Sequence, residues 1–291
     1  MKNKKLIVVL GMHRGGTSVT TRSLSVFNID LGNTLIRADK NINVKGYWED
    51  RDINMLNNEM LKAINSNWHE LIPITHLDII KLHKKGYLDR AVKLLIKKVG
   101  DNHIWGFKDP RVSKLLLFWN QVFLACKFNV YYILSIRNPM SVAESLNKRD
   151  KFDREMSYLL WLEYIITALI NSNETKRIIV NFDHLINQPE KELTRMSKIL
   201  KLDIDFHELE QFTLNFIDKN LRHNNYTTNE LYFKNSNTLL LDVYKHLIYS
   251  HKLNNNKVQY WSLQQQKLVK QYILENPHYT KIKSRDEIIF S

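Results

Sequence analysis

The chain has 291 residues, of which 44% are hydrophobic and 25% charged, and these proportions are those of a globular protein with a sizeable core. The single cysteine, Cys126, excludes an intramolecular disulfide and fits a reducing compartment. The apolar run before Gly11 is too short for a signal peptide, and no stretch reaches the roughly 20 apolar residues of a membrane span. We therefore expect a cytoplasmic protein with no integral membrane segment.

The formal net charge of +13 predicts an anionic partner. Nucleic acid, a phosphorylated cofactor, an acidic glycan and a membrane face all fit such a charge. The lysines and arginines are scattered along the chain rather than gathered in one basic arm, which disfavours nucleic acid.

Short runs of β-branched and aromatic residues predict strands at 6–10, 104–108, 130–136 and 177–182. The stretches between them carry apolar residues at helical spacing. Two such faces comprise Ile53, Leu56, Met60, Leu61 and Ile64, and Leu88, Ala91, Val92 and Leu95. Apolar strands separated by helices favour an α/β fold, with a parallel sheet flanked by helices on both faces.

No repeat or linker divides the chain, so we expect a single domain over 1–291. Residues 1–187 would form the cofactor-binding α/β core and 188–291 a mostly helical extension. The asparagine-rich stretch 223–238 predicts a mobile loop within that extension.

A glycine loop follows the first predicted strand, in the segment LIVVLGMHRGGTSVTTRSL. Gly11, Gly15 and Gly16 let the backbone take positive φ and approach a ligand closely. The spacing from Gly11 to Gly16 is that of a Walker A loop, but Thr17 stands where the lysine is expected. The missing lysine argues against a nucleoside-triphosphate hydrolase or kinase.

Arg14 supplies the positive charge of this loop instead. Thr17 and Ser18 open the next helix, where free N–H groups and the helix dipole favour an anion. The alternative is a glycine turn that only packs a helix on a strand, with Arg14 in solvent.

A second candidate phosphate site lies in the segment VYYILSIRNPMSVAESLNKRD. Arg137 leaves a strand at its carboxyl end, where open α/β sheets bind ligands, and Ser145 follows on the next helix. An arginine fork with a hydroxyl suits a terminal phosphate. Ser141 and Glu144 match a capping box that starts this helix. The alternative places Arg137 in a surface salt bridge.

Together the two motifs resemble the donor site of sulfotransferases, which use 3′-phosphoadenosine 5′-phosphosulfate (PAPS). MHRGGTS resembles their 5′-phosphosulfate loop, and the arginine version is similar to tyrosylprotein and many bacterial sulfotransferases. Arg137 and Ser145 resemble their 3′-phosphate site. His13 replaces the usual proline and Gly15 the usual serine, so any contact from Gly15 must come from its backbone N–H.

This resemblance implies that PAPS is the donor, with its 5′-phosphosulfate on the loop. The residues expected to hold the donor are Arg14, Gly15, Gly16, Thr17, Ser18, Arg137 and Ser145. Arg222, in Leu221-Arg222-His223, resembles a basic element that closes over the donor in many bacterial members. The resemblance spans roughly residues 6–189 and is weak beyond residue 194.

Sulfuryl transfer needs positive charge at the transferring group and a base for the acceptor hydroxyl, and it can proceed without a metal. Lys108, in GFKDPRVSKLL, resembles the lysine that stabilises the transferring group in tyrosylprotein sulfotransferases, and Arg14 would assist it. The alternative is an ordinary strand-end lysine paired with Asp109.

Glu49, in KGYWEDRDINMLN, resembles the glutamate base of tyrosylprotein and some bacterial members. Tyr47 and Trp48 would give it a drier setting. The competing interpretation treats the acids here as helix N-terminal residues, a role for which Asp50 or Asp52 is better placed. The members that act on small phenols and steroids use a histidine base; the reserve candidates here are His69, His76 and His103.

The segment RIIVNFDHLINQPE resembles a scaffold element of the family, with Phe182 and Leu185 in the core and Pro189 at a helix start. Trp161 is also predicted to be a core residue. The sequence therefore indicates a sulfotransferase acting on an acceptor hydroxyl, for which an anionic glycan or another cell-surface precursor suits the charge. The alternatives are a P-loop kinase-like enzyme and a non-enzymatic basic nucleic-acid-binding protein.

Overall fold

The computed structural model describes residues 4–38, 45–172, 176–218, 226–227, 229–231, 237–249 and 254–276. Its sheet has four parallel strands in the order β2-β1-β3-β4. The strands are β1 (Lys5–Leu10), β2 (Ile104–Lys108), β3 (Asn129–Ile136) and β4 (Arg177–Asn181). The predicted α/β fold with a parallel sheet is confirmed, and no predicted strand end is displaced by more than one residue.

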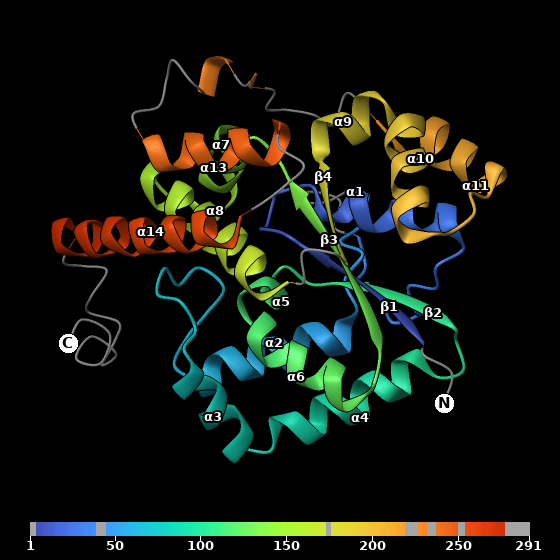
Figure 1. The fold of residues 1–291 in the computed structure, drawn as a ribbon, viewed down its shortest axis with the longest axis horizontal. Coiled ribbons are helices and arrows are strands. Elements are labelled where there is room, and N and C mark those ends of the chain that lie inside the picture. The colour runs from blue at the N-terminus through green and yellow to red at the C-terminus, as the bar shows by residue number, and fades with distance from the viewer. Residues whose placement is uncertain are drawn as a thin grey trace.

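Both faces of the sheet are buried, as the near-continuous apolar strands predict. In β1, Leu6, Val8 and Leu10 enter one core cluster, whereas Ile7 and Val9 enter the other. Figure 1 shows the helices on the two sides of the sheet.

Much of the larger cluster is contributed by helices that precede or follow β2 and β3. They are α2 (Arg51–Ala63), α3 (His76–Lys84), α4 (Tyr87–Val99), α5 (Arg111–Lys114), α6 (Leu116–Ala125), α7 (Pro139–Asp150) and α8 (Arg154–Asn171). Short elements cover the other face: α1 (Thr17–Arg22), η1 (Ser23–Phe27), α9 (Phe182–Asn187), α10 (Pro189–Leu200), α11 (Phe206–Glu210) and η3 (Gln211–Phe216). The predicted apolar face of α2 is buried, and Trp161 is a core residue as expected.

The described part of the chain after residue 187 is mostly helical, as predicted. The helices α13 (Thr238–Tyr249) and α14 (Asn255–Glu275) pack against α8. Polar contacts fix α14: buried Gln265 donates to Glu163 Oε2 at 3.2 Å, and the Tyr272 hydroxyl donates to Asp153 at 2.8 Å. Glu163 of α8 also pairs with the buried ammonium of Lys114 of α5 at 3.4 Å, so α14 is connected to both of these helices.

The predicted capping box of Ser141 and Glu144 is wrong. Helix α7 begins two residues earlier, at Pro139, and the Asn138 side chain caps it by accepting from Met140 N at 2.9 Å. Proline suits the first helical position because its fixed φ is helical and no N–H is needed there. Ser141 instead accepts a hydrogen bond from Tyr226 N at 3.4 Å.

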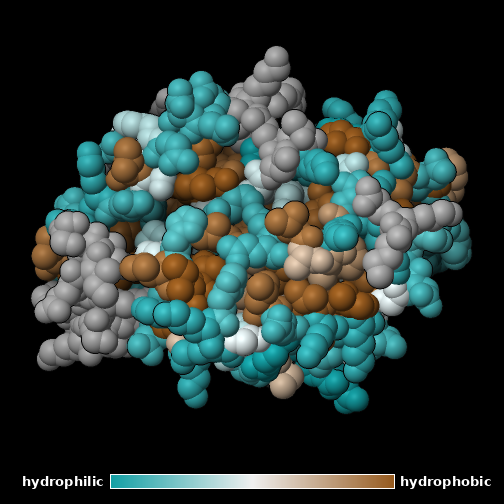
Figure 2. Space-filling view, turned by 60° about the horizontal axis from the view of Figure 1, so that its bottom comes forward, coloured by the Kyte–Doolittle hydropathy of each residue, from teal (hydrophilic) through white to brown (hydrophobic). Residues whose placement is uncertain are grey.

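Within the described ranges, none of the helices has both the length and the apolar composition needed to cross a bilayer. Apolar side chains do reach the surface, as the brown areas among hydrophilic side chains in Figure 2 show. Exposed apolar side chains of α2, α3 and α4 include Met55, Leu77, Ile80 and Ile96. Such exposure is common on globular proteins.

Candidate active site

The glycine loop after β1 lies at the carboxyl end of the sheet, where β1 has β2 on one side and β3 on the other. Gly11 and Gly16 take positive φ values of 141° and 86°, as predicted. The third left-handed residue is Arg14, at φ 65°, and not Gly15. Gly15 is needed for space, because a Cβ there would lie 2.8 Å from the Met12 carbonyl oxygen. Its N–H donates to that oxygen at 3.0 Å, so it is already used within the loop.

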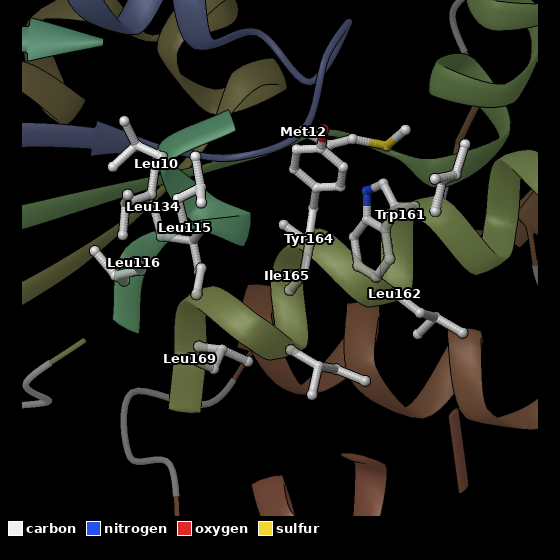
Figure 3. Packing of buried hydrophobic residues seen from close by; sticks show 14 of the residues in the cluster. Leu10, Met12, Leu115, Leu116, Leu134, Trp161, Leu162, Tyr164, Ile165 and Leu169 are labelled. Carbon is white, nitrogen blue, oxygen red and sulfur yellow. The ribbon is translucent and has the colours of Figure 1, made fainter. Parts of the chain in front are cut away.

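Buried hydroxyls from neighbouring elements hold the loop in this shape. Gly11 N donates to Ser113 Oγ of α5 at 2.9 Å, and Ser135 Oγ of β3 donates to Gly15 O at 3.0 Å. Met12 is buried in the same core cluster as Tyr164 of α8, and both lie in the view of Figure 3. The loop is therefore anchored on its β2 side, its β3 side and its base.

Arg14, Arg137 and Ser145 meet at this edge of the sheet. Arg14 Nε donates to Ser145 Oγ at 2.6 Å, and Arg137 Nη1 donates to the Arg14 carbonyl oxygen at 3.4 Å. Trp161 Nε1 of α8 donates to the Arg137 carbonyl oxygen at 3.2 Å and so fixes the start of this turn. Arg14 and Arg137, which are 123 positions apart in the sequence, thus form with the Ser145 hydroxyl one positively charged corner of the site.

Phe182 completes this corner and is not the core residue that the sequence predicts. It is half-buried, and the Arg137 guanidinium lies 4.6 Å from its ring centroid. A Cβ at Gly16 would lie 2.5 Å from Phe182 Cδ2. The ring therefore packs against both motifs, because α9 starts at Phe182 itself and turns this side chain toward the loop. Leu185 is buried and Pro189 begins α10, as predicted.

Lys108 and Glu49 form a buried ion pair on the other side of the loop. Lys108 Nζ lies 2.9 Å from Glu49 Oε1, and the two side chains are 1% and 9% exposed. The same ammonium donates to the Tyr47 carbonyl and, at 3.3 Å, to Ser18 Oγ. Lys108 is therefore not the strand-end lysine paired with Asp109 that the alternative describes.

Asp109 has a supporting role instead. It is fully buried and accepts from Arg111 Nη1 at 3.0 Å and from Asn57 Nδ2 at 3.2 Å. Burial opposes the charge of Arg111, but Asp109 and Glu49 beside it raise the pKa of its guanidinium. Arg111 lies 3.9 Å from Glu49 Oε2.

Glu49 reaches Lys108 because of a bend in the chain just before α2. Trp48 takes a left-handed φ of 56°, and the helix is capped by Asp50, which accepts from Asp52 N and Ile53 N at 3.0 Å. The interpretation of Asp50 as a helix N-terminal acid is confirmed. The Glu49 side chain lies outside the cap and accepts from Asn54 Nδ2 at 2.8 Å.

Arg149 of α7 is a further cation here that the sequence motifs did not single out. Its guanidinium lies 5.2 Å from the Trp68 ring centroid. Burial lowers the pKa of Arg14, and the charge of Arg149 adds to this effect. Arg149 follows Ser145 by four residues, one helical turn, and this spacing is the signal that could have identified it.

The three histidines predicted as reserve candidates for the base lie in different surroundings. The His69 ring centroid lies 5.2 Å from that of Trp68 and 5.5 Å from that of Phe152, next to the loop. His76 is exposed at the start of α3, and His103 is exposed before β2, at the opposite edge of the sheet from Lys108. Arg222 and most of the predicted 223–238 loop lie outside the described residues.

No three histidine, cysteine, aspartate or glutamate side chains gather as metal ligands in the part of the chain that the structure describes. That a metal takes no part in the chemistry stays a prediction.

No family model matches this chain, and no curated protein matches it. Among solved structures it is similar to the sulfotransferase domain from the Synechococcus PCC 7002 olefin synthase. The identity is 14% and the TM-score 0.44, over 90% of this chain and 95% of that chain. It is also similar to the sulfotransferase domain from the curacin biosynthetic pathway, with 14% identity and a TM-score of 0.45, over 91% and 98% of the two chains. Similarity at this level assigns no activity to this chain.

Proposed function

We propose that this protein transfers the sulfuryl group of PAPS to the hydroxyl of an acceptor. The observation that carries the proposal is the meeting of Arg14, Arg137 and Ser145 at the carboxyl ends of β1 and β3. A donor with phosphates at both its 5′ and 3′ positions needs two adjacent anion sites, and these residues supply both within one corner.

In this proposal the 3′-phosphate lies on Arg137 and Ser145, and the 5′-phosphosulfate lies on the loop from Arg14 to Ser18. Ser145 now accepts from Arg14 Nε, so donor binding exchanges this contact for phosphate oxygens. Phe182 holds the Arg137 guanidinium from one face and leaves its edge for a phosphate.

Lys108 and Glu49 supply the chemistry. The acceptor oxygen attacks sulfur, the bond from sulfur to the 5′-phosphate oxygen breaks, and its electron pair stays on the leaving phosphate. Glu49 takes the acceptor proton, while Lys108 and Arg14 stabilise the negative charge of the transferring and leaving groups. The 2.9 Å pair, which holds Glu49 beside Lys108, supports these two roles.

Titration calorimetry with adenosine 3′,5′-bisphosphate (PAP) tests the donor site. We expect the wild type to bind PAP and Arg137→Ala to bind it about 30- to 150-fold more weakly, because a charge-assisted phosphate contact is worth about 2–3 kcal/mol. Arg90→Ala is the matched control. It removes the same charge from an exposed pair with Glu59, where the side chains are 52% and 45% exposed.

Unchanged PAP affinity in Arg137→Ala contradicts the 3′-phosphate assignment. Tight binding of ATP with Mg²⁺ and none of PAP would instead favour a kinase-like enzyme. Radiolabelled PAPS offered with glycan, lipid and tyrosine-peptide panels then identifies the acceptor, for which the charge of +13 favours an anionic glycan.

A further inference from the structure

His13 belongs to the phosphate loop, yet neither the donor contacts nor the acid–base chemistry uses it. Its ring centroid lies 4.7 Å from that of Trp68 and 5.9 Å from that of Tyr164. Its Nε2 is buried and has no hydrogen-bond partner among the residues that the structure describes. Most buried polar atoms in proteins have a partner, and a catalytic role is one explanation for an atom that has none.

The charges that face His13 come from several elements. Arg14 lies next to it in the loop, Lys108 ends β2, Arg111 begins α5 and Arg149 lies on α7. Burial, followed by the charges of these four cations, holds the pKa of the His13 imidazole well below its usual value. The ring is therefore neutral near pH 7. It packs against Trp68, over whose ring the Arg149 guanidinium lies at 5.2 Å, and it is next to Arg14 in the loop.

A neutral imidazole in this position is a poor base but a good hydrogen-bond donor. Lys108, Arg111 and Arg149 are each paired with a carboxylate, of Glu49, Asp109 and Asp150. Burial, with the remaining effect of these cations and of Arg14, nevertheless disfavours a proton on this ring, at a nitrogen already shielded from water. A neutral N–H adds a directed hydrogen bond to an anion without adding further charge.

We propose that His13 Nε2 donates a hydrogen bond to an oxygen of the sulfuryl group as it passes between donor and acceptor. This inference rests on the proposed function and adds a catalytic residue to it. His13 gains and loses no proton in the step, because the acceptor proton goes to Glu49. Its hydrogen bond is present only while a sulfuryl group occupies the site, so it adds nothing to the binding of PAP.

PAP and vanadate test this directly on the full chain, since vanadate beside PAP mimics the five-coordinate transferring group. By calorimetry we expect vanadate to tighten PAP binding to the wild type. In His13→Leu this tightening should fall about 10- to 100-fold, the range for loss of one donor to a developing anion, while the Kd of PAP alone stays within about twofold. His13→Gln keeps an N–H donor and should recover part of the loss.

His83→Leu is the matched control. His83 lies on α3, and its Nε2 is also buried without a partner among the described residues. Its ring centroid lies 6.1 Å from that of Phe118. We expect this variant to keep the full effect of vanadate. In ¹⁵N spectra of histidine-labelled protein, the resonance missing from His13→Gln should move with PAP plus vanadate and not with PAP alone.

Failure of the wild type to bind PAP refutes the proposed function, and this inference falls with it. If PAP binds, the inference is overturned when vanadate has no effect on the wild type or when its full effect survives in His13→Leu. It is also overturned if the His13 resonance does not move when vanadate is added to PAP. The same holds if His13→Leu and His13→Gln weaken the binding of PAP alone as strongly as they weaken its binding with vanadate.

Discussion

The ion pair of Lys108 and Glu49 makes a quantitative prediction that does not depend on any ligand. The perturbations are Glu49→Gln, Lys108→Met and the double variant. At 2.9 Å and with 1% and 9% exposure, the pair lies in a setting where water screens little. An effective dielectric constant of about 20 gives an attraction of about 6 kcal/mol at that distance.

Desolvation of the two charges offsets part of this attraction, and removing one partner of a buried pair typically costs about 3–5 kcal/mol. Lys108 keeps the Tyr47 carbonyl and the Ser18 hydroxyl as acceptors in Glu49→Gln. For Glu49→Gln we therefore expect the lower end of this range, a loss of about 3 kcal/mol in the free energy of unfolding. The double variant should lose less than the sum of the single variants by about 2 kcal/mol, since it leaves no charge unpaired.

Urea unfolding followed by tryptophan fluorescence and by circular dichroism measures these free energies, and coincident transitions justify a two-state treatment. Glu59→Gln breaks the exposed pair with Arg90 and should cost no more than about 1 kcal/mol. Strictly additive losses in the double variant would show that the two charges do not interact, and the reasoning would be refuted.

Three further predictions concern the loop and the helix that follows β3. Gly16→Ala should lose about 2–4 kcal/mol of stability, because alanine is strained at φ 86° and its Cβ meets Phe182; adding Phe182→Ala should recover the steric part, as urea unfolding would show. Asn138→Ala should lower the stability by at least about 1 kcal/mol, because it removes the α7 cap and the hydrogen bonds from Nδ2 to the Tyr226 and Thr227 carbonyl oxygens; an unchanged denaturation midpoint would argue against that cap. The folded state holds the pKa of His13 below its unfolded value, so the unfolded chain binds more protons and stability falls as pH drops below about 6.5. His13→Gln should flatten this fall by up to about 1.4 kcal/mol per pH unit, and an identical pH slope in wild type and variant would contradict the neutral imidazole.

Local sequence patterns predicted the sheet well. Strand runs and helical spacing depend on neighbouring residues, so the four strands and the buried face of α2 were predicted within a residue or two. The predicted start of α7 was wrong because two capping patterns overlap in this part of the sequence. Asn138 with Pro139 competes with Ser141 and Glu144, and only the fold shows that the Ser141 hydroxyl is engaged by Tyr226.

The site was predicted in part, because residue types could be read but their surroundings could not. Arg14 was chosen from the loop after the first strand, Arg137 from the end of a strand and Ser145 from the helix that follows, and the three residues do meet. Phe182 was assigned to the core because its segment resembles a scaffold element, and its packing against the Arg137 guanidinium depends on the turn into α9. The roles of these residues toward a donor stay predictions.

The sequence by itself determined the parallel sheet, the glycine loop after β1 and the cations placed at strand ends, because periodicity and backbone freedom are local properties. Only the tertiary structure decided which charges face one another. Lys108 pairs with a carboxylate 59 positions away, and the pKa of His13 is lowered by cations from different elements. These relations follow from the crossovers and side-chain packing that bring distant segments together, and no short stretch of sequence encodes them.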